Sequence, residues 1–172
     1  MRSQPSILIT GTPGVGKTTL CELVSAATGY PHYNVSQMAK DGNMLDGWDE
    51  EYQTHVLNED KLLDELEPLV HPGGAIVDYH GCELFPKRWF DLVVVLCADN
   101  TVLYDRLSAR GYTGKKLSDN VESEIMQVIL QEAHESYDAE IILHLENDTT
   151  EQMEQNVQTI SEWIAQYKLK HA

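Results

Sequence analysis

Basic residues are scarce in this sequence. Its 172 residues include 12 Lys and Arg against 28 Asp and Glu, which gives a formal net charge of −16. A protein that binds nucleic acid through a broad basic face needs the opposite balance, so this composition excludes that class of function. Any macromolecular partner is expected to be basic.

Cysteine and long apolar runs are also rare. Cys21, Cys82 and Cys97 are odd in number, scattered and without C-x-x-C spacing, which predicts a reducing compartment and no zinc site. No apolar run reaches the length of a membrane span, and residues 1–6 are too short and polar for a signal peptide. We therefore expect a soluble protein that is not secreted and has no membrane partner. The length predicts a single domain over residues 1–172.

The most informative segment is Gly11–Thr18, which fits the pattern G-x-x-x-x-G-K-[ST]. An apolar run, Ile7–Ile9, precedes it and a helical pattern, Lys17–Ala27, follows it, so the motif joins a strand to a helix. Its glycines let successive backbone N–H groups approach phosphate oxygens, and the helix N-terminus adds further donors. Lys17 is expected to bridge the β- and γ-phosphates, and the Thr18 hydroxyl to ligate Mg²⁺.

Five apolar segments alternate with helical patterns, which predicts an α/β fold with a five-stranded parallel sheet, right-handed crossovers and helices on both faces. The expected strands are Ile7–Thr10, His32–Val35, Gly74–Asp78, Leu92–Leu96 and Glu140–Leu145. The expected helices are 17–27, 36–40 capped by Ser36, 58–70, 101–110, 119–137 opened by the capping box Asp119-x-x-Glu122, and a terminal helix to 168 opened by Thr149-x-x-Gln152.

The segment Ala75–Val77 is apolar and ends in Asp78. In a P-loop nucleotide site, the carboxylate at the end of a second strand holds Mg²⁺, so we interpret Asp78 as that group. The alternative is an aspartate that merely ends a strand. His80 follows two residues later and is a candidate to orient a water or the γ-phosphate, or to act as a base. The alternative for His80 is a hydrogen-bonded loop histidine.

Two further segments are predicted to close over the site. Residues 41–58 form an irregular acidic insertion, which is either functional or a solvated surface loop. Arg106 and Arg110 lie one helical turn apart and suit a clamp on a phosphoryl group, or else a solvated helix end favoured by the dipole. The connection Gly111–Leu117 is short, basic and flanked by glycines, as in a mobile lid.

The motifs together indicate a P-loop kinase. GTPases normally add an Asn-Lys-x-Asp guanine reader, and the sequence has none, so ATP is the expected donor. A lid and a second insertion after the second strand are typical of a P-loop kinase whose acceptor is a small phosphorylated molecule.

At the level of whole segments, the chain resembles the adenylate kinase isoenzyme 6 family, also described as a coilin-interacting nuclear ATPase and a ribosome-assembly ATPase. The resemblance covers nearly the whole chain and rests on Gly11–Thr19, Asp78-Tyr79-His80-Gly81-Cys82, Phe85-Pro86-Lys87-Arg88-Trp89-Phe90, Arg106–Tyr112 and Lys115–Asn120.

The resemblance implies a three-layer nucleoside monophosphate kinase fold, with residues 34–57 as the monophosphate-binding segment and 109–119 as a short lid. It assigns ATP binding to Pro13, Gly14, Val15, Gly16, Lys17, Thr18, Thr19 and Arg110, monophosphate binding to Asn34, Lys40 and Arg88, metal binding to Thr18 and Asp78, and catalysis to Lys17, His80, Arg106 and Arg110. Lys40 stands where adenylate kinases usually have an arginine. It keeps the charge but not the bidentate fork, which predicts weaker monophosphate binding.

By the same resemblance, the expected reaction is ATP plus AMP giving two ADP, with dAMP and CMP as further acceptors, Mg²⁺ as cofactor and an ATPase activity beside it. It also implies a monomer of the nucleus and cytoplasm that takes part in small ribosomal subunit maturation. The alternative is an ATP-switched assembly factor for a basic small-subunit ribosomal protein, in which AMP phosphorylation is minor. A kinase for a small metabolite fits the fold as a third alternative.

Overall fold

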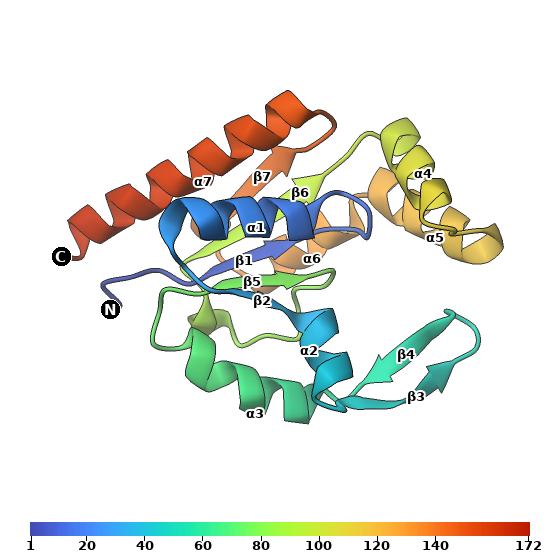
Figure 1. Ribbon diagram of the computed structural model, residues 1–172, viewed down its shortest axis with the longest axis horizontal. Helices are drawn as coiled ribbons and strands as arrows, with labels where there is room; N and C mark the ends of the chain where they lie inside the picture. The colour runs from blue at the N-terminus through green and yellow to red at the C-terminus, as the bar shows by residue number, and fades with distance from the viewer.

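A five-stranded parallel sheet forms the centre of the computed structural model, which describes residues 1–172 (Figure 1). Its strand order is β2-β5-β1-β6-β7. The strands are β1 (Ile7–Thr10), β2 (His32–Asn34), β5 (Ile76–Tyr79), β6 (Leu92–Cys97) and β7 (Ile142–Glu146). The predicted fold class is confirmed. Because β1 pairs with both β5 and β6, the loop that follows β1 leaves the sheet at its middle.

Helices cover both faces of this sheet, which explains its continuous apolar strands. One face packs against α1 (Lys17–Thr28), α4 (Asn100–Ala109) and α7 (Thr150–Lys170), and the other against α2 (Val35–Asp41), α3 (Glu59–Val70) and α6 (Val128–Ser136). Side chains of β1 alternate between the two faces of the sheet. Ile7 and Ile9 pack in the core under α1, α4 and α7, and Leu8 packs in the core under α2, α3 and α6. No helix is both long and apolar enough to cross a membrane.

Several helix ends follow local capping chemistry. Gly29 ends α1 in the left-handed conformation with φ 79°. The Thr149 hydroxyl accepts a hydrogen bond from the Gln152 N–H at the start of α7, as predicted. The predicted cap Ser36 is wrong, because Ser36 lies inside α2. The cap is Asn34, two residues earlier, whose side chain accepts from the Gln37 N–H at 3.0 Å.

Residues 41–58 are more ordered than an irregular insertion. They contain an antiparallel hairpin of β3 (Leu45–Asp49) and β4 (Thr54–Leu57), with Trp48 opposite His55. Most of its side chains are exposed, so the hairpin has no apolar alternation that sequence could reveal. Figure 1 shows it projecting from α2 on the same side of the molecule as α4 and α5.

The predicted long helix from Asp119 to Tyr137 is wrong. The structure has two helices, α5 (Gly114–Ile125) and α6, separated by Gln127 in the left-handed conformation with φ 52°. The helix starts at Gly114, so Asp119 and Glu122 lie inside α5 and do not form a cap. Two short 3-10 helices, η1 (Lys87–Trp89) and η2 (Ala139–Ile141), complete the chain.

Candidate active site

The loop between β1 and α1 depends on its glycines for close packing. Gly16 has φ 98°, and a Cβ on it would lie 2.5 Å from the Asn147 side-chain nitrogen. At Gly11, a Cβ would lie 2.4 Å from the Leu96 carbonyl oxygen. Both positions therefore require glycine, and the loop backbone fits tightly against the ends of β6 and β7.

Lys17 lies folded over this loop. Its ammonium group donates to the Thr12 carbonyl oxygen at 3.0 Å, and the residue is only 9% exposed. Burial lowers the pKa of Lys17 to about 8; Asp78 raises it in part, and Arg110 lowers it further. The ammonium group is thus a desolvated cation at the loop where phosphates are expected to bind.

Asp78, at the end of β5, faces the loop across the start of α1. It is 4% exposed, and its Oδ2 accepts from the Thr18 hydroxyl at 2.8 Å and from the Asn34 amide at 3.3 Å. His32 Nε2 lies 3.1 Å from the same oxygen. Thr18 and Asp78 together offer the oxygen donors that Mg²⁺ prefers. The same Asn34 caps α2, so one side chain joins this carboxylate to the helix beside the cleft.

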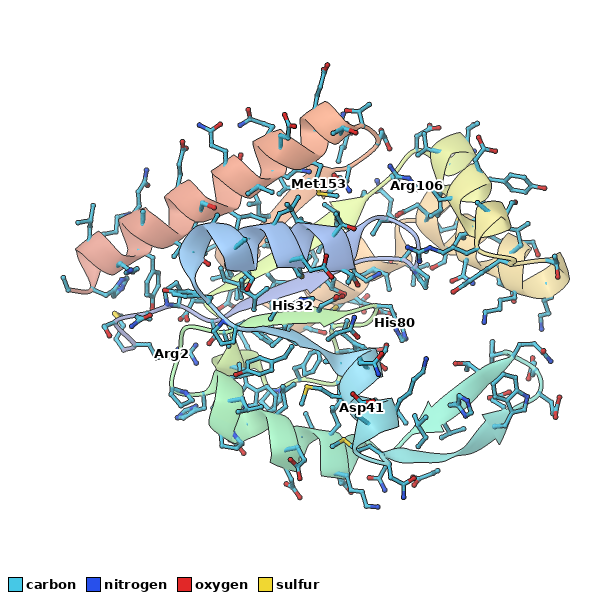
Figure 2. The ribbon with its side chains drawn as sticks, in the orientation of Figure 1. Arg2, His32, Asp41, His80, Arg106 and Met153 are labelled. Atoms are coloured by element: carbon cyan, nitrogen blue, oxygen red, sulfur yellow. The ribbon has the colours of Figure 1, made fainter.

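His80 lies on the wall of a cleft of about 660 Å³ (Figure 2). Desolvation by the surrounding walls, and then the Lys17 cation, lower the pKa of His80 from its ordinary value. The ring is exposed to the open cleft, so solvent weakens both effects, but both favour the neutral imidazole. Neutral His80 can accept a hydrogen bond from a water, and its ring packs in a tilted arrangement against Tyr79, with 4.2 Å between the ring centroids.

The cleft is bounded by the β1–α1 loop, α2, the hairpin, the exit of β5 and α5. Residues from these five elements include Thr12, Pro13, Ser36, Lys40, Trp48, Tyr52, Tyr79, His80, Lys116 and Asn120. The hairpin and α5 meet across its mouth: Lys115 lies 3.5 Å from Glu51, and Lys116 donates to the Gln53 carbonyl oxygen at 3.3 Å. Both predicted covering segments therefore line one cavity.

The two lid arginines have different surroundings. Arg106 donates to the carbonyl oxygens of Asn147 at 2.9 Å, Asp148 at 3.1 Å and Gly14 at 3.4 Å, so it lies behind the loop (Figure 2). In this position it braces the loop backbone and does not face the cleft as a phosphoryl clamp. Arg110 is the exposed residue that ends α4, and its charge acts on Lys17.

Arg88 does not join the cleft. It lies in η1, before the start of β6, where its guanidinium pairs with Glu67 of α3. Its carbonyl oxygen accepts from Arg2, at the amino ends of the strands. The structure therefore does not place Arg88 where the expected monophosphate-binding role requires it. The reason is packing, because the buried rings of Phe85, Trp89 and Phe90 hold this segment in the core beneath the sheet.

Comparison with known proteins agrees with this geometry. The family model described as AAA domain matches residues 7–127. The Adenylate kinase isoenzyme 6 homolog of Dictyostelium discoideum is 47% identical over 170 residues, covering 99% of this chain and 97% of that protein. The homolog of the same name from Caenorhabditis elegans is 47% identical over 172 residues, covering 99% and 94%. The chain belongs to the adenylate kinase isoenzyme 6 family.

Solved structures show that the chain has the fold of P-loop kinases. A shikimate kinase from Acinetobacter baumannii, solved with shikimate, has a TM-score of 0.68 and 15% identity, and the match covers 96% of each chain. At that identity the likeness shows the fold alone. Family and fold together identify a nucleotide kinase of the P-loop class.

Three residues of the site lie outside the sequence motifs that indicate the family. His32 contacts Asp78, and Asn147 is 2% exposed and donates to the Val15 carbonyl oxygen at 2.8 Å. Glu124 of α5 is 8% exposed and accepts from the Ala98 N–H at 3.3 Å. Burial raises the pKa of Glu124 to about 7. In sequence Glu124 looks like any solvated helix residue, because the contact that buries it lies 26 residues away in the chain.

Proposed function

We propose that this protein transfers the γ-phosphoryl group of ATP to AMP and yields two ADP, with slow ATP hydrolysis as a second activity. The observation that carries the proposal is the walled cleft of about 660 Å³, which is lined by Thr12 and Pro13 of the glycine loop and by His80, two residues after Asp78. An oxygen of the AMP phosphate would form a bond to the γ-phosphorus while the bond from that phosphorus to the β–γ bridging oxygen breaks. The acceptor oxygen is already ionised, so the transfer needs positioning and charge neutralisation more than a base.

The donor side of the reaction relies on residues already described. Backbone N–H groups of the glycine loop and the Lys17 ammonium group would hold the β- and γ-phosphates, with Arg110 approaching from the end of α4. The Thr18 hydroxyl and Asp78 carboxylate fit Mg²⁺, because both are oxygen donors 2.8 Å apart at the start of α1. Bound there, Mg²⁺ would neutralise charge on the two phosphates.

The acceptor side of the cleft offers fewer groups that could bind a phosphate. Lys40 is the cation that lines the cleft from α2, and Arg88 is at the other end of the sheet. A lysine ammonium group binds phosphate as a point charge without bidentate geometry. This supports a modest affinity for AMP, and similarly for dAMP and CMP. His80 would orient a water when the acceptor is absent, which supports the accompanying hydrolysis.

A second function is favoured by the charge distribution. The hairpin carries Asp49, Glu50 and Glu51 at its turn, on a chain with a net charge of −16. We propose a basic small-subunit ribosomal protein as the partner of this acidic edge, with ATP turnover controlling its release. In this role the protein would act as a monomer of the nucleus and cytoplasm.

A single-pot assay tests both functions. Wild type, Lys17→Ala and His80→Ala are each given Mg-ATP with AMP, dAMP or CMP, and diphosphate and free phosphate are quantified together. Phosphoryl transfer predicts mainly diphosphate from wild type, and a selective loss of free phosphate in His80→Ala. Free phosphate at one rate whatever the acceptor would overturn the first function in favour of the second. Product formed by Lys17→Ala would overturn both.

A further inference from the structure

Beneath α1, three side chains of metal-ligating types meet from three separate elements. Cys21 of α1, His32 of β2 and Asp78 of β5 each present one ligand atom, and these atoms all lie within 4.8 Å of one another. No other group of three His, Cys, Asp or Glu residues in the chain meets in this way. The sulfur and nitrogen belong to residues outside the Thr18 and Asp78 pair assigned above to Mg²⁺.

The ligand set differs in kind from a magnesium site. Mg²⁺ requires oxygen ligands in nearly octahedral geometry, whereas a thiolate with an imidazole favours Zn²⁺ and ions of similar softness. With bonds of roughly 2.0–2.3 Å, tetrahedral ligand atoms lie roughly 3.3–3.8 Å apart. The His32 to Asp78 separation is already 3.1 Å, and no two of the three ligand atoms are more than 4.8 Å apart, so side-chain rotations must bring the sulfur closer by up to about 1 Å.

We propose that Cys21, His32 and Asp78 form a second metal site that takes Zn²⁺ or a similarly thiophilic divalent ion, and that this ion competes with Mg²⁺-nucleotide for the Asp78 carboxylate. Three protein ligands leave a fourth tetrahedral position for water or the Thr18 hydroxyl. Occupation of the site would withdraw Asp78 from its bond to Thr18. The ion would therefore inhibit nucleotide turnover.

Metal binding at this site requires a route for the ion and loss of the thiol proton. Cys21 is fully buried, while the His32 side chain is 14% exposed, so an ion would approach from the His32 side. Burial, and then Asp78, raise the pKa of the Cys21 thiol well above its ordinary value. A bound ion would displace that proton to solvent and take the thiolate, while His32 would bind through Nε2 with its proton on Nδ1.

Cobalt is the probe for this site, because a thiolate bound to Co²⁺ gives a charge-transfer band. The full-length protein is titrated with Co²⁺ in the absence of Mg²⁺ and nucleotide. We expect one ion per chain, with the band in wild type and in Cys97→Ala, and its loss in Cys21→Ala. Zn²⁺ should displace the Co²⁺, and its affinity for Cys21→Ala should be lower by about a hundredfold or more, since even supporting residues of a site contribute that much.

Circular dichroism without metal checks that Cys21→Ala is folded. A second variant keeps the test valid if Cys21→Ala misfolds. The double variant Cys82→Ala/Cys97→Ala retains Cys21 as its only thiol and must keep the band. Absence of a band in wild type, or its loss in the double variant, would overturn the site. Addition of Mg²⁺ with ATP should then release the Co²⁺, and retention would overturn the competition. These readouts require no turnover, so they can fail or succeed independently of the proposed kinase reaction.

Discussion

On the α2 side of the cleft, one flexible cation is available to the acceptor phosphate. Lys40 is exposed near the end of α2 and lines the cleft, while Arg88 is paired with Glu67 elsewhere. A single ammonium group on a four-carbon stem holds a phosphate without fixing its orientation. A single substitution at Lys40 is therefore expected to change the affinity for the monophosphate.

Lys40→Arg restores a planar fork at this position and should improve monophosphate binding. Two parallel hydrogen bonds to the acceptor phosphate are expected to lower the KM for AMP by about tenfold, with little change in kcat. Steady-state kinetics with varied AMP measures this effect. Lys61→Arg on α3, outside the cleft, is the control. An unchanged KM, or an equal fall in the control, would show that Lys40 does not meet the acceptor.

At the scale of elements, the nucleotide loop is supported from behind. Asn147, which follows β7, donates to the Val15 carbonyl oxygen, while Arg106 of α4 donates to that of Gly14. Side chains from α4 and from the segment after β7 thus hold the backbone of the loop in place.

Asn147→Ala removes one of these supports and leaves the buried Val15 carbonyl oxygen without its donor. We expect the free energy of unfolding to fall by about 1–3 kcal/mol, and ATP binding to weaken with it. Urea unfolding and nucleotide titration give the two quantities. Asn100→Ala, at an exposed position of α4, should leave both unchanged. Equal effects in the two variants would contradict a bracing role.

Helix α5 contains a buried carboxyl group that titrates near neutral pH. Glu124 of α5 lies buried against the Ala98 N–H, near Lys17 and Asp148. Because the pKa of Glu124 is raised from 4.5 to about 7, the folded protein keeps a proton that the unfolded chain has already lost. The free energy of unfolding therefore falls as pH rises through this range and stays low above it.

Glu124→Gln, which cannot ionise, should abolish this part of the pH dependence. Relative to wild type, the variant is expected to be more stable by about 2 kcal/mol at pH 8 and nearly equal at pH 4.5. Urea unfolding at both pH values tests this. Glu122→Gln on the exposed face of the same helix serves as control. A variant less stable than wild type at pH 8 would mean that the carboxylate is stabilised there by its cationic neighbours.

On the scale of the whole molecule, negative charge dominates the surface. The acidic hairpin projects from the body of the fold, so its charges are accessible to an approaching partner (Figure 1). Such a field steers a basic partner during approach more than it strengthens the final complex.

Glu50→Gln/Glu51→Gln should slow association with a basic small-subunit ribosomal protein by about two- to fivefold at low salt, and by less at high salt. The association rate is measured by stopped-flow fluorescence. Glu151→Gln/Glu154→Gln on α7 removes the same charge from another surface and should have the smaller effect. Equal slowing by both pairs would indicate that net charge, and not the hairpin, guides the partner.

Much of the donor side of the site could be predicted because it depends on local pattern. A glycine motif between an apolar strand and a helix, and an aspartate at the end of a second strand, must lie at one edge of a parallel sheet. Thr18 and Asp78 accordingly meet at 2.8 Å. Residues that belong to no such pattern, such as Asn147 and Glu124, gave no sign of their position.

The sequence alone determined the α/β class, the nucleotide loop and the strand that ends in Asp78, since short-range chemistry and the rules of parallel sheets suffice for each. Only the tertiary structure decided that Arg88 lies with Glu67, that Arg106 backs the loop, and that Cys21 and His32 reach Asp78. These outcomes depend on how buried side chains pack the two faces of the sheet, and such long-range contacts leave no periodic trace in the chain.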